Sequence, residues 1–424
     1  MKKYCYNIFI TKSRGRMRMI KKLKAKSPSY FKDFKCIGGE CEDSCCIGWD
    51  IDVDHKTYDN YMKCENTDFN ELFRNNMHLN DECSNENVDH AKINLQEDKK
   101  CPFLDKCNYC RIHSELGEEH LSNTCSHFPR VLNKVDEEYE ISLDIACPEA
   151  ARIVLSDKKS VSFEENDLEL NKYIVAGEID TEDEEYEEYP IKHFKKIRDY
   201  CIYIIQNRDF DLSSRLYILG DFLFRLEEDC YEDSSIVCEF IENYDLKEVA
   251  ENYQRNDLNY MMQISFLHNI INSLEIYDET DSELFRKYTK QALDGVNIES
   301  NEQLEEDSDR YIDAFADYSS DYIEENNYIF ENYLVNFIYN NLFPYSESDS
   351  MFEGYMMLLV RYSLIRFYLV GRYLCNKNES VNDIINFMQV FSKAVEHDKN
   401  YMEEILEYIL ENEFDNMEFA EMLI

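Results

Sequence analysis

Cysteine is concentrated in one part of this chain, and that concentration limits what the chain can fold into. Eleven of the sixteen cysteines lie between Cys36 and Cys147. Thiolates are soft metal ligands, and crowded thiolates in a reducing compartment indicate zinc or iron–sulfur more often than disulfides. The sequence therefore predicts a small domain in the first third of the chain whose limited core is supplemented by a metal.

The spacing of these cysteines leaves three interpretations open. They fall into groups, which are Cys36, Cys41, Cys45 and Cys46, then Cys101, Cys107 and Cys110, then Cys125, and then Cys147. A zinc ribbon has two CxxC knuckles, and only the pair Cys107 and Cys110 has that spacing. Four thiolates of an iron–sulfur cluster also fit the crowding. In the third interpretation the cysteines bind no metal and act as small hydrophobic residues, which explains isolated cysteines but not the crowded ones. The cysteines assigned to this class are Cys5, Cys64, Cys83, Cys201, Cys230, Cys238 and Cys375.

Length and charge argue against several classes of protein. The 424 residues suffice for two or three domains, and 44% of them are hydrophobic, which predicts a folded protein. The formal net charge of −43 argues against nucleic acid and anionic membrane as partners, because their phosphates would repel the protein. The apolar stretch 355–374 is interrupted by Arg361, Arg366 and Arg372. No membrane span is therefore expected, and the protein is predicted to be cytoplasmic.

Changes in composition divide the chain into four parts. Residues 1–28 are expected to be a disordered basic extension, because the first 26 carry ten Lys or Arg and no acid. Residues 29–155 form the cysteine-rich metal or iron–sulfur domain. In residues 156–190 the periodicity weakens and acidic residues accumulate, which predicts a solvated acidic linker. Residues 191–424 are predicted to be a helical domain.

Local patterns predict the type of each domain. Residues 49–54 alternate apolar and charged side chains as a half-buried strand does, and residues 131–145 read as a hairpin that turns near Asp136. Pro148 suits the first position of a helix. After Pro190 the pattern is helical, with one face formed by Leu358, Tyr362, Ile365 and Leu369. The predicted fold class is mainly α, with a small mixed α+β cysteine-rich domain followed by an all-helical domain.

Ordered blocks of residues resemble a known family. The run from Tyr30 to Trp49, with Cys45 and Cys46 near its end, looks like the opening of the flagellin lysine-N-methylase family. Later blocks follow the family order and are Cys101-Pro102-Phe103-Leu104, Cys110-Arg111-Ile112, Leu121-Ser122-Asn123-Thr124-Cys125, Phe128-Pro129-Arg130 and Cys147-Pro148-Glu149-Ala150-Ala151-Arg152. The helical region continues the match through Glu331-Asn332-Tyr333-Leu334-Val335-Asn336, Leu342-Phe343-Pro344, Leu364-Ile365-Arg366-Phe367 and Phe391-Ser392-Lys393-Ala394-Val395-Glu396-His397.

The resemblance implies an enzyme that transfers methyl groups from S-adenosylmethionine to lysines of flagellin. It also implies an iron–sulfur cluster, with [4Fe–4S] as the expected form and zinc as the alternative. The matching thiols, which are the implied ligands, are Cys36, Cys41, Cys45, Cys46, Cys101, Cys110, Cys125 and Cys147. One cubane cluster needs half that number, so either a second metal is bound or some of these thiols are structural. Cys107 falls where the family pattern has no cysteine.

Polar residues in the helical region are candidates for catalysis and cofactor binding. The chain has no GxGxxG turn, so S-adenosylmethionine requires a pocket unlike that of Rossmann-type methyltransferases. Lys393 and His397 share a predicted helix face, and together with Glu396 they are the candidate catalytic residues. Arg361 and Arg366 are candidates for binding the cofactor through a bidentate clamp on its carboxylate. The alternative for each is an ion pair with the abundant acids.

Two rival functions come from other classes of protein. In one, the protein is a non-enzymatic zinc- or iron-binding adaptor whose cysteines only fold the first domain. In the other it is an iron–sulfur oxidoreductase, a reading weakened by the lack of a recognisable nicotinamide or flavin loop. Within the methylase interpretation, an open iron of the cluster is a possible site for the amino-carboxylate end of S-adenosylmethionine. Tyr333 and Phe337 are predicted to be core residues rather than a shelf for adenine.

Overall fold

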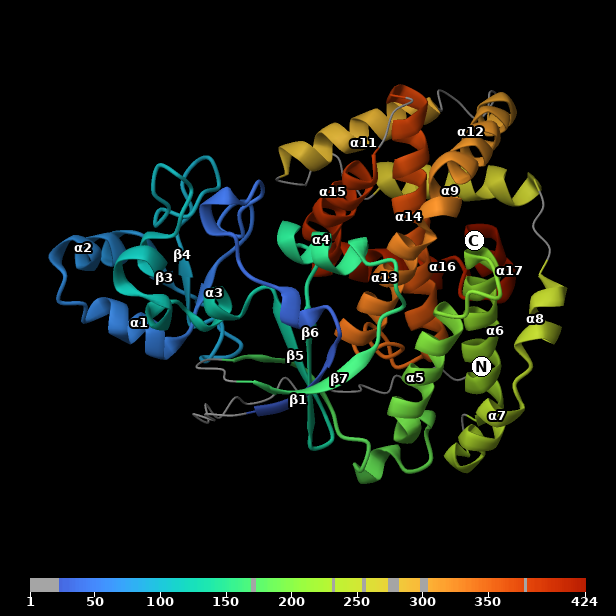
Figure 1. Ribbon diagram of the computed structural model, residues 1–424, viewed down its shortest axis with the longest axis horizontal. Helices are drawn as coiled ribbons and strands as arrows, with labels where there is room; N and C mark the ends of the chain where they lie inside the picture. The colour runs from blue at the N-terminus through green and yellow to red at the C-terminus, as the bar shows by residue number, and fades with distance from the viewer. Residues whose placement is uncertain are drawn as a thin grey trace. The chain divides into compact units, whose positions relative to one another are not determined.

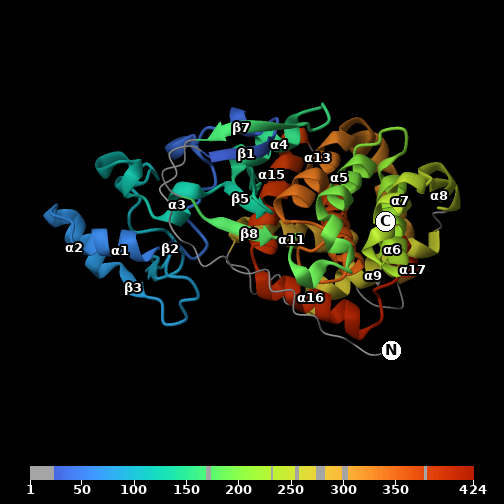
Figure 2. The ribbon, with the colours of Figure 1, turned by 90° about the horizontal axis from the view of Figure 1, so that it is seen from below.

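The computed structural model describes residues 23–168, 173–230, 233–253, 257–273, 282–297, 304–376 and 380–424. The chain divides into two compact units (Figures 1 and 2). The cysteine-rich unit contains the described residues up to Ile153 together with Ser162–Ile179, and the helical unit contains Val154–Val161 and Asp180–Ile424. The predicted fold class is confirmed. Most of the predicted basic extension, residues 1–22, lies outside the described residues.

One sheet of the cysteine-rich unit has five strands in the order β7-β1-β6-β5-β8. Its members are β1 (Leu23–Pro28), β5 (Arg130–Val135), β6 (Glu138–Leu143), β7 (Phe163–Leu168) and β8 (Val175–Ile179). β5 and β6 are the predicted hairpin, paired antiparallel with Leu132 opposite Ile141. At the turn Asp136 has φ 56°, a left-handed conformation that Asp tolerates better than most residues. The hairpin prediction is therefore confirmed, including its turn.

β1 and β7 lie where the sequence suggested a basic extension and an acidic linker, and here the structure differs. β1 alternates buried apolar residues such as Leu23 with solvated lysines, as an amphipathic strand does. Lys24 lies opposite Asp167 in the antiparallel pairing of the two strands. Lys26 lies opposite Glu165 in the same register. Opposite charges on facing residues favour this pairing, so residues 23–28 and 163–168 are paired strands rather than solvated segments.

The second sheet of this unit has three strands in the order β2-β4-β3. The strands are β2 (Asp52–Val53), β3 (Met77–Leu79) and β4 (Ala91–Ile93), and the helices between β2 and β3 are α1 (His55–Met62) and α2 (Thr67–Asn75). The ring of Phe73 stacks on Tyr61 at 4.0 Å between centroids and lies 5.2 Å from that of Phe103. The predicted strand over 49–54 is present only over the two residues of β2. The unit also contains α3 (Asn123–His127), and α4 (Pro148–Ser156) begins at the predicted proline.

The helical unit surrounds one long buried helix, α14 (Met351–Asn376), which stands near its middle in Figure 1. The other helices are α5 (Phe194–Ile205), α6 (Leu212–Cys230), α7 (Val237–Asn243), α8 (Leu246–Asn252), α9 (Asp257–Ser273), α11 (Glu283–Val296), α12 (Leu304–Tyr318), α13 (Glu324–Asn340), α15 (Val381–Phe391), α16 (Lys399–Glu411) and α17 (Met417–Leu423). Every residue of α14 from Gly354 to Tyr373 is buried, so the predicted apolar face is only part of its contact surface. In the part of the chain that is described, no helix combines the length and apolarity that a membrane crossing requires.

Short helical turns connect these elements. The 3-10 turns are η1 (Phe31–Asp33), η2 (Gly38–Glu40), η4 (Glu118–His120), η5 (Glu184–Tyr186), η6 (Pro190–His193) and η7 (Ser234–Ile236), and the π-helical turns are η3 (Ile112–Leu116), η8 (Ser319–Ile323) and η9 (Ser392–Glu396). π-Helical turns are rare in proteins, and many of those that occur lie at functional sites. η9 is notable because it contains two of the three predicted catalytic residues.

Two glycines let α11 and α14 approach backbone to backbone. A Cβ placed on Gly295 would lie 1.9 Å from the carbonyl oxygen of Gly371. A Cβ on Gly371 would lie 2.6 Å from the carbonyl oxygen of Ala292. Both distances are far below van der Waals contact, so any larger residue here would force the two helices apart.

Candidate functional site

Backbone hydrogen bonds hold the first two cysteine groups together. The amide of Cys101 donates to the carbonyl oxygen of Cys46 at 2.8 Å, and the residues flanking this pair form an antiparallel bridge. The indole N–H of Trp49 donates to the carbonyl oxygen of Cys45 at 2.7 Å. Because of these bonds, Cys45 and Cys46 stay beside the segment that carries Cys101.

Two further cysteines join the same region. Cys110 forms an antiparallel bridge with Leu104, which closes the loop that follows Cys101. Cys125 lies in the first turn of α3, where its amide donates to the hydroxyl of the N-cap residue Ser122 at 3.1 Å. One aromatic core cluster includes or contacts Cys46, Cys101, Cys110 and Cys125.

The thiols of this group raise one another's pKa. Burial, together with the charges of Cys110 and Cys45, raises the pKa of Cys101 to about 12. Burial likewise raises the pKa of Cys125 and of Cys110, and the charge of Cys45 adds to both. A hydrogen bond with Cys45 is the largest cause that raises the pKa of Cys46, followed by burial. Cys45 therefore lies within electrostatic reach of the other four thiols.

Cys41 and Cys147 are also neighbours of Cys45. Burial, together with the charges of Cys41 and Cys45, raises the pKa of Cys147 to about 12. Burial also raises the pKa of Cys41, where Cys45 again contributes. Cys36 is exposed, and its charge acts on the guanidinium of Arg130, whose pKa is lowered by burial. Cys45 thus acts electrostatically on six of the other seven implied ligands.

Two of the three cysteines predicted to be bystanders in this unit have other surroundings, whereas Cys64 packs against the same aromatic core as the candidate ligands. The thiol of Cys83 donates to the carboxylate of Asp89 at 3.4 Å. Cys107 is exposed, and its amide donates to the carboxylate of Asp105 at 2.7 Å.

The chemistry of the gathered thiols suits a thiophilic metal. Across the described ranges no three Cys, His, Asp or Glu side chains converge closely enough to hold a metal ion as they stand. No disulfide joins any of the described cysteines. Buried thiols that raise one another's pKa are costly to ionise, and a bound cation reverses that cost by neutralising the thiolates. The donor set fits, and side-chain rotation has to bring the sulfurs onto the metal.

In the helical unit, the predicted catalytic residues lie at η9. Lys393 and Glu396 are half-buried within this π-helical turn, and His397 is exposed just after it. The hydroxyl of Tyr333, on α13, donates a short hydrogen bond to the Glu396 carboxylate. Burial raises the pKa of Tyr333 well above its usual value, and the charge of Glu396 raises it further. Tyr333 and Phe337 are both buried, so their assignment to the core is confirmed.

Arg361 lies in the same neighbourhood. Its charge acts on both Tyr333 and Tyr401, where it opposes the rise in pKa that burial causes. Its guanidinium forms an ion pair with Glu347 and lies 4.9 Å above the ring of Phe337. Two buried polar atoms here, Nε of Arg361 and the hydroxyl of Tyr401, have no hydrogen-bond partner among the described residues. Unpartnered buried polar atoms are rare, and a missing ligand, ion or water is one explanation for them.

Arg366 lies elsewhere and has a structural environment. Its guanidinium is buried and donates to the carbonyl oxygens of Leu423, at 2.7 Å, and Ile424. It also lies over the ring of Phe315, with the guanidinium carbon 5.1 Å from the ring centroid. The structure therefore brings Arg361, but not Arg366, to the region of Glu396.

One buried ionic network was not predicted. The carboxylate of Glu331, which is 1% exposed, accepts hydrogen bonds from Arg208 at 2.9 Å and from Arg215 at 2.8 Å. The next residue, Asn332, donates to the carbonyl oxygens of Val154 and Asp157. The sequence signal that could have revealed this network is Glu331 itself, a charged residue at the edge of a largely apolar helical stretch.

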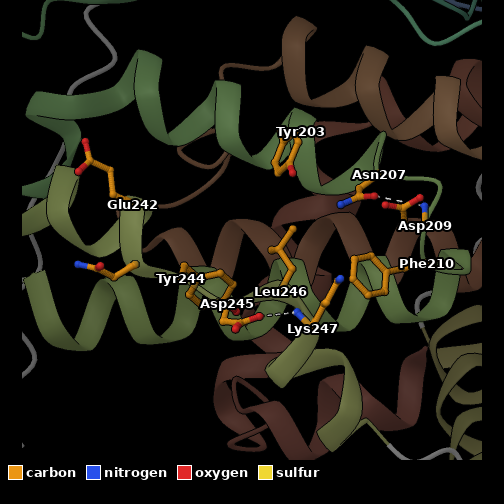
Figure 3. Close-up of a pocket in the computed structure, with 10 residues that line it drawn as sticks. Tyr203, Asn207, Asp209, Phe210, Glu242, Tyr244, Asp245, Leu246 and Lys247 are labelled. Carbon is orange, nitrogen blue, oxygen red and sulfur yellow. Dashed lines mark hydrogen bonds between the residues drawn. The ribbon is translucent and has the colours of Figure 1, made fainter.

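An open cavity of about 480 Å³ lies between the end of α5 and the α7–α8 connection. Figure 3 shows Tyr203, Leu246 and Phe210 facing it together with polar side chains. Its lining residues are Tyr203, Asn207, Asp209, Phe210, Glu242, Asn243, Tyr244, Asp245, Leu246 and Lys247. None of the predicted catalytic or cofactor residues is in this set.

Comparison with known proteins identifies relatives along most of the chain. Residues 198–423 match the family model described as the FliB lysine N-methylase C-terminal domain. The lysine-N-methylase of Salmonella typhimurium strain LT2 is 23% identical over 396 residues, which cover 89% of this chain and 93% of that protein. The flagellar biosynthetic protein FliU of Salmonella muenchen is 31% identical over 147 residues, or 34% of this chain and 85% of FliU. No solved structure matches.

Proposed function

The chain belongs to the FliB lysine N-methylase family and is a protein-lysine N-methyltransferase, and we propose that it methylates lysines of flagellin with S-adenosylmethionine as the donor. Support for flagellin as the substrate comes from the flagellar name of the relative FliU and from the residue blocks described above. Described cysteines that form no disulfides fit a reducing compartment, so we place the reaction in the cytoplasm.

The observation that carries the active-site proposal is the hydrogen bond from Tyr333 to Glu396. Only a neutral amine attacks a sulfonium methyl group, so the lysine ammonium must first lose a proton. We assign Glu396 as the group that accepts this proton, and Tyr333 as the residue that orients the carboxylate. Lys393 and His397 flank the carboxylate in sequence. Lys393, as a cation, would favour the neutral form of the substrate amine by repulsion, and the exposed His397 is placed to contact the substrate protein.

The cofactor is assigned to the neighbourhood of Arg361. A guanidinium suits the carboxylate of S-adenosylmethionine, and Nε of Arg361 and the hydroxyl of Tyr401 are donors without described partners. The charge of Arg361 acts on Tyr333, the partner of Glu396, and it also acts on Tyr401. Donor and base would therefore lie close enough for the amine to be aligned with the methyl group.

The metal is assigned to the thiols around Cys45. Four of the set Cys45, Cys46, Cys101, Cys110 and Cys125 would hold a [4Fe–4S] cluster, since the last four share one core and the charge of Cys45 acts on each of them. When bound, the cluster would crosslink the loops through its iron–thiolate bonds and so stabilise a unit with a small core. Cys41 and Cys147 are the alternates, because they also interact with Cys45. Zinc is the competing metal for the same donors.

The experiment is a methylation assay with anaerobically purified protein, flagellin and S-adenosylmethionine, read by intact mass of the flagellin. We expect methyl increments on lysine, lost in Glu396→Gln. A protein with full metal content that adds no methyl groups to flagellin, yet methylates another protein, contradicts the substrate assignment alone. Visible absorption of the purified protein separates an iron–sulfur cluster from zinc, because zinc is colourless.

A further inference from the structure

Three polar side chains meet at the beginnings of α5 and α7. The ammonium of Lys196 donates to the sulfur of Cys238 at 2.9 Å. Nδ1 of His193 lies 3.9 Å from the same sulfur, within the range of a hydrogen bond to sulfur. Cys238 is half-buried and Lys196 is exposed, so small reagents can reach the sulfur. None of the residues assigned to methyl transfer or metal binding belongs to this group.

The imidazole of His193 is held in place beside this thiol. It hydrogen-bonds to the backbone at Ser234, and the hydroxyl of Ser234 donates in turn to the carbonyl oxygen of Glu187 at 2.7 Å. Burial lowers the pKa of His193, and the charge of Lys196 lowers it further. The ring is therefore neutral at physiological pH and can accept a proton. A cysteine beside a fixed neutral imidazole and a cation has the parts of an activated thiol.

The other described cysteines of the helical unit lack this combination. Cys201 and Cys230 are 0% exposed. Cys375 is exposed, but its thiol donates to the carbonyl oxygen of Gln291 at 3.0 Å, and burial raises its pKa with a contribution from the charge of Asp294. At Cys375 the carbonyl oxygen of Gln291 and the charge of Asp294 favour the protonated thiol. At Cys238 the ammonium of Lys196 favours the thiolate instead. Cys375 is thus an internal control for Cys238.

We propose that Cys238 is a nucleophilic modification site that reacts with hydroperoxides. His193 accepts the thiol proton, and Lys196 stabilises the resulting thiolate by a charge-assisted hydrogen bond. The sulfur attacks one oxygen of the peroxide, an S–O bond forms, and the O–O bond breaks. The hydroxide or alkoxide leaves with the bonding pair and takes up the proton from His193. Sulfur is oxidised by two electrons to a sulfenic acid, and the peroxide is reduced to water or an alcohol.

The first test measures alkylation of the native, full-length protein by iodoacetamide, with each cysteine followed by peptide mass spectrometry. We expect Cys238 to react about tenfold or more faster than Cys375, the range that a contacting cation gives. Lys196→Met should bring the two rates together, and Lys196→Arg should retain the difference. Equal rates at the two cysteines of the unaltered protein would overturn the proposal whether or not either variant folds.

The second test treats the protein with hydrogen peroxide and traps sulfenic acid with dimedone. The adduct should form at Cys238 and fall in Lys196→Met, and it should be absent from Cys375. Because Lys196 is exposed, thermal unfolding of Lys196→Met should match that of the unaltered protein. An adduct that forms equally at both cysteines, or is unchanged in Lys196→Met, would refute the role of the lysine.

Discussion

The hydroxyl of Tyr333 donates a hydrogen bond to the carboxylate of Glu396 and so joins α13 to η9 across 63 residues of sequence. If this carboxylate accepts the substrate proton, Glu396→Gln should lower kcat by about 10²- to 10⁴-fold. Tyr333→Phe keeps the carboxylate but removes its orienting bond, so a smaller loss is expected. The measurement is initial methylation rate over a range of flagellin concentrations.

The matched control for that series is Tyr203→Phe, which removes the hydroxyl of a 53% exposed tyrosine on α5. It should leave the rate unchanged. Glu396→Gln with an unaltered rate would remove Glu396 from catalysis. Loss of activity that tracks loss of folded protein, by circular dichroism, would instead assign it a structural role.

Replacement of Cys45 or its neighbour Cys46 should affect metal content more than replacement of Cys107 or Cys375, because Cys45 interacts with six other thiols, Cys46 among them. Cys45→Ser should strip metal and destabilise the cysteine-rich unit, and Cys46→Ser should do the same. Cys107→Ser within this unit and Cys375→Ser in the helical unit should leave metal content unchanged. Metal analysis per protein chain provides the readout, and equal losses in all four variants would contradict the assignment.

Removal of the buried charge at Glu331 should be strongly destabilising. Glu331→Gln leaves Arg215, which is 3% exposed, without its ion-pair partner. Breaking a buried pair in this way costs about 3–5 kcal/mol in the free energy of unfolding. The exposed Glu325 lies on the same helix, and Glu325→Gln should change stability by about 0.5 kcal/mol or less. Urea denaturation of the two variants compares them directly, and similar midpoints would show that the network contributes little.

The contact between α11 and α14 predicts a second stability effect. Gly371→Ala inserts a methyl group 2.6 Å from the carbonyl oxygen of Ala292, so the two helices must separate. Overpacking of this kind costs about 1–3 kcal/mol in the free energy of unfolding. Lys290→Ala, at an exposed position of α11, is the control and should unfold at the same temperature as the unaltered protein. A Gly371→Ala protein of unchanged stability would mean that the helices move apart at no cost.

Local signals in the sequence predicted local structure well. The hairpin of β5 and β6, the start of α4 and the helical apolar face within α14 each follow from patterns within a few residues. β1, β7 and β8 could not be predicted in this way, because their partners are distant in sequence and their charged residues resemble solvated segments. Lys24, for example, lies in a strand that pairs with the distant segment containing Asp167, and the local sequence does not show this pairing.

The candidate sites show the same limit. Cysteine crowding identified the thiols, but only the fold shows that Cys45 lies among most of them. Glu396 was selected for its place on a helix face, yet the turn that contains it is π-helical and its partner Tyr333 was predicted only as core. Arg361 and Arg366 have the same residue type and nearby positions. The fold separates them, because one faces Glu347 and the other faces Leu423.

The strand order β7-β1-β6-β5-β8 bears on how this protein can be divided for separate study. Cutting at residues 29 and 155, as the change in composition suggests, would discard β1, β7 and β8. The remaining hairpin of β5 and β6 would then expose both of its long edges, with unpaired N–H and C=O groups available to other chains. Such a fragment should aggregate even with its full complement of thiols and metal. A soluble version must keep residues 23–179, and with them the two charged strands that the composition assigns to other parts of the chain.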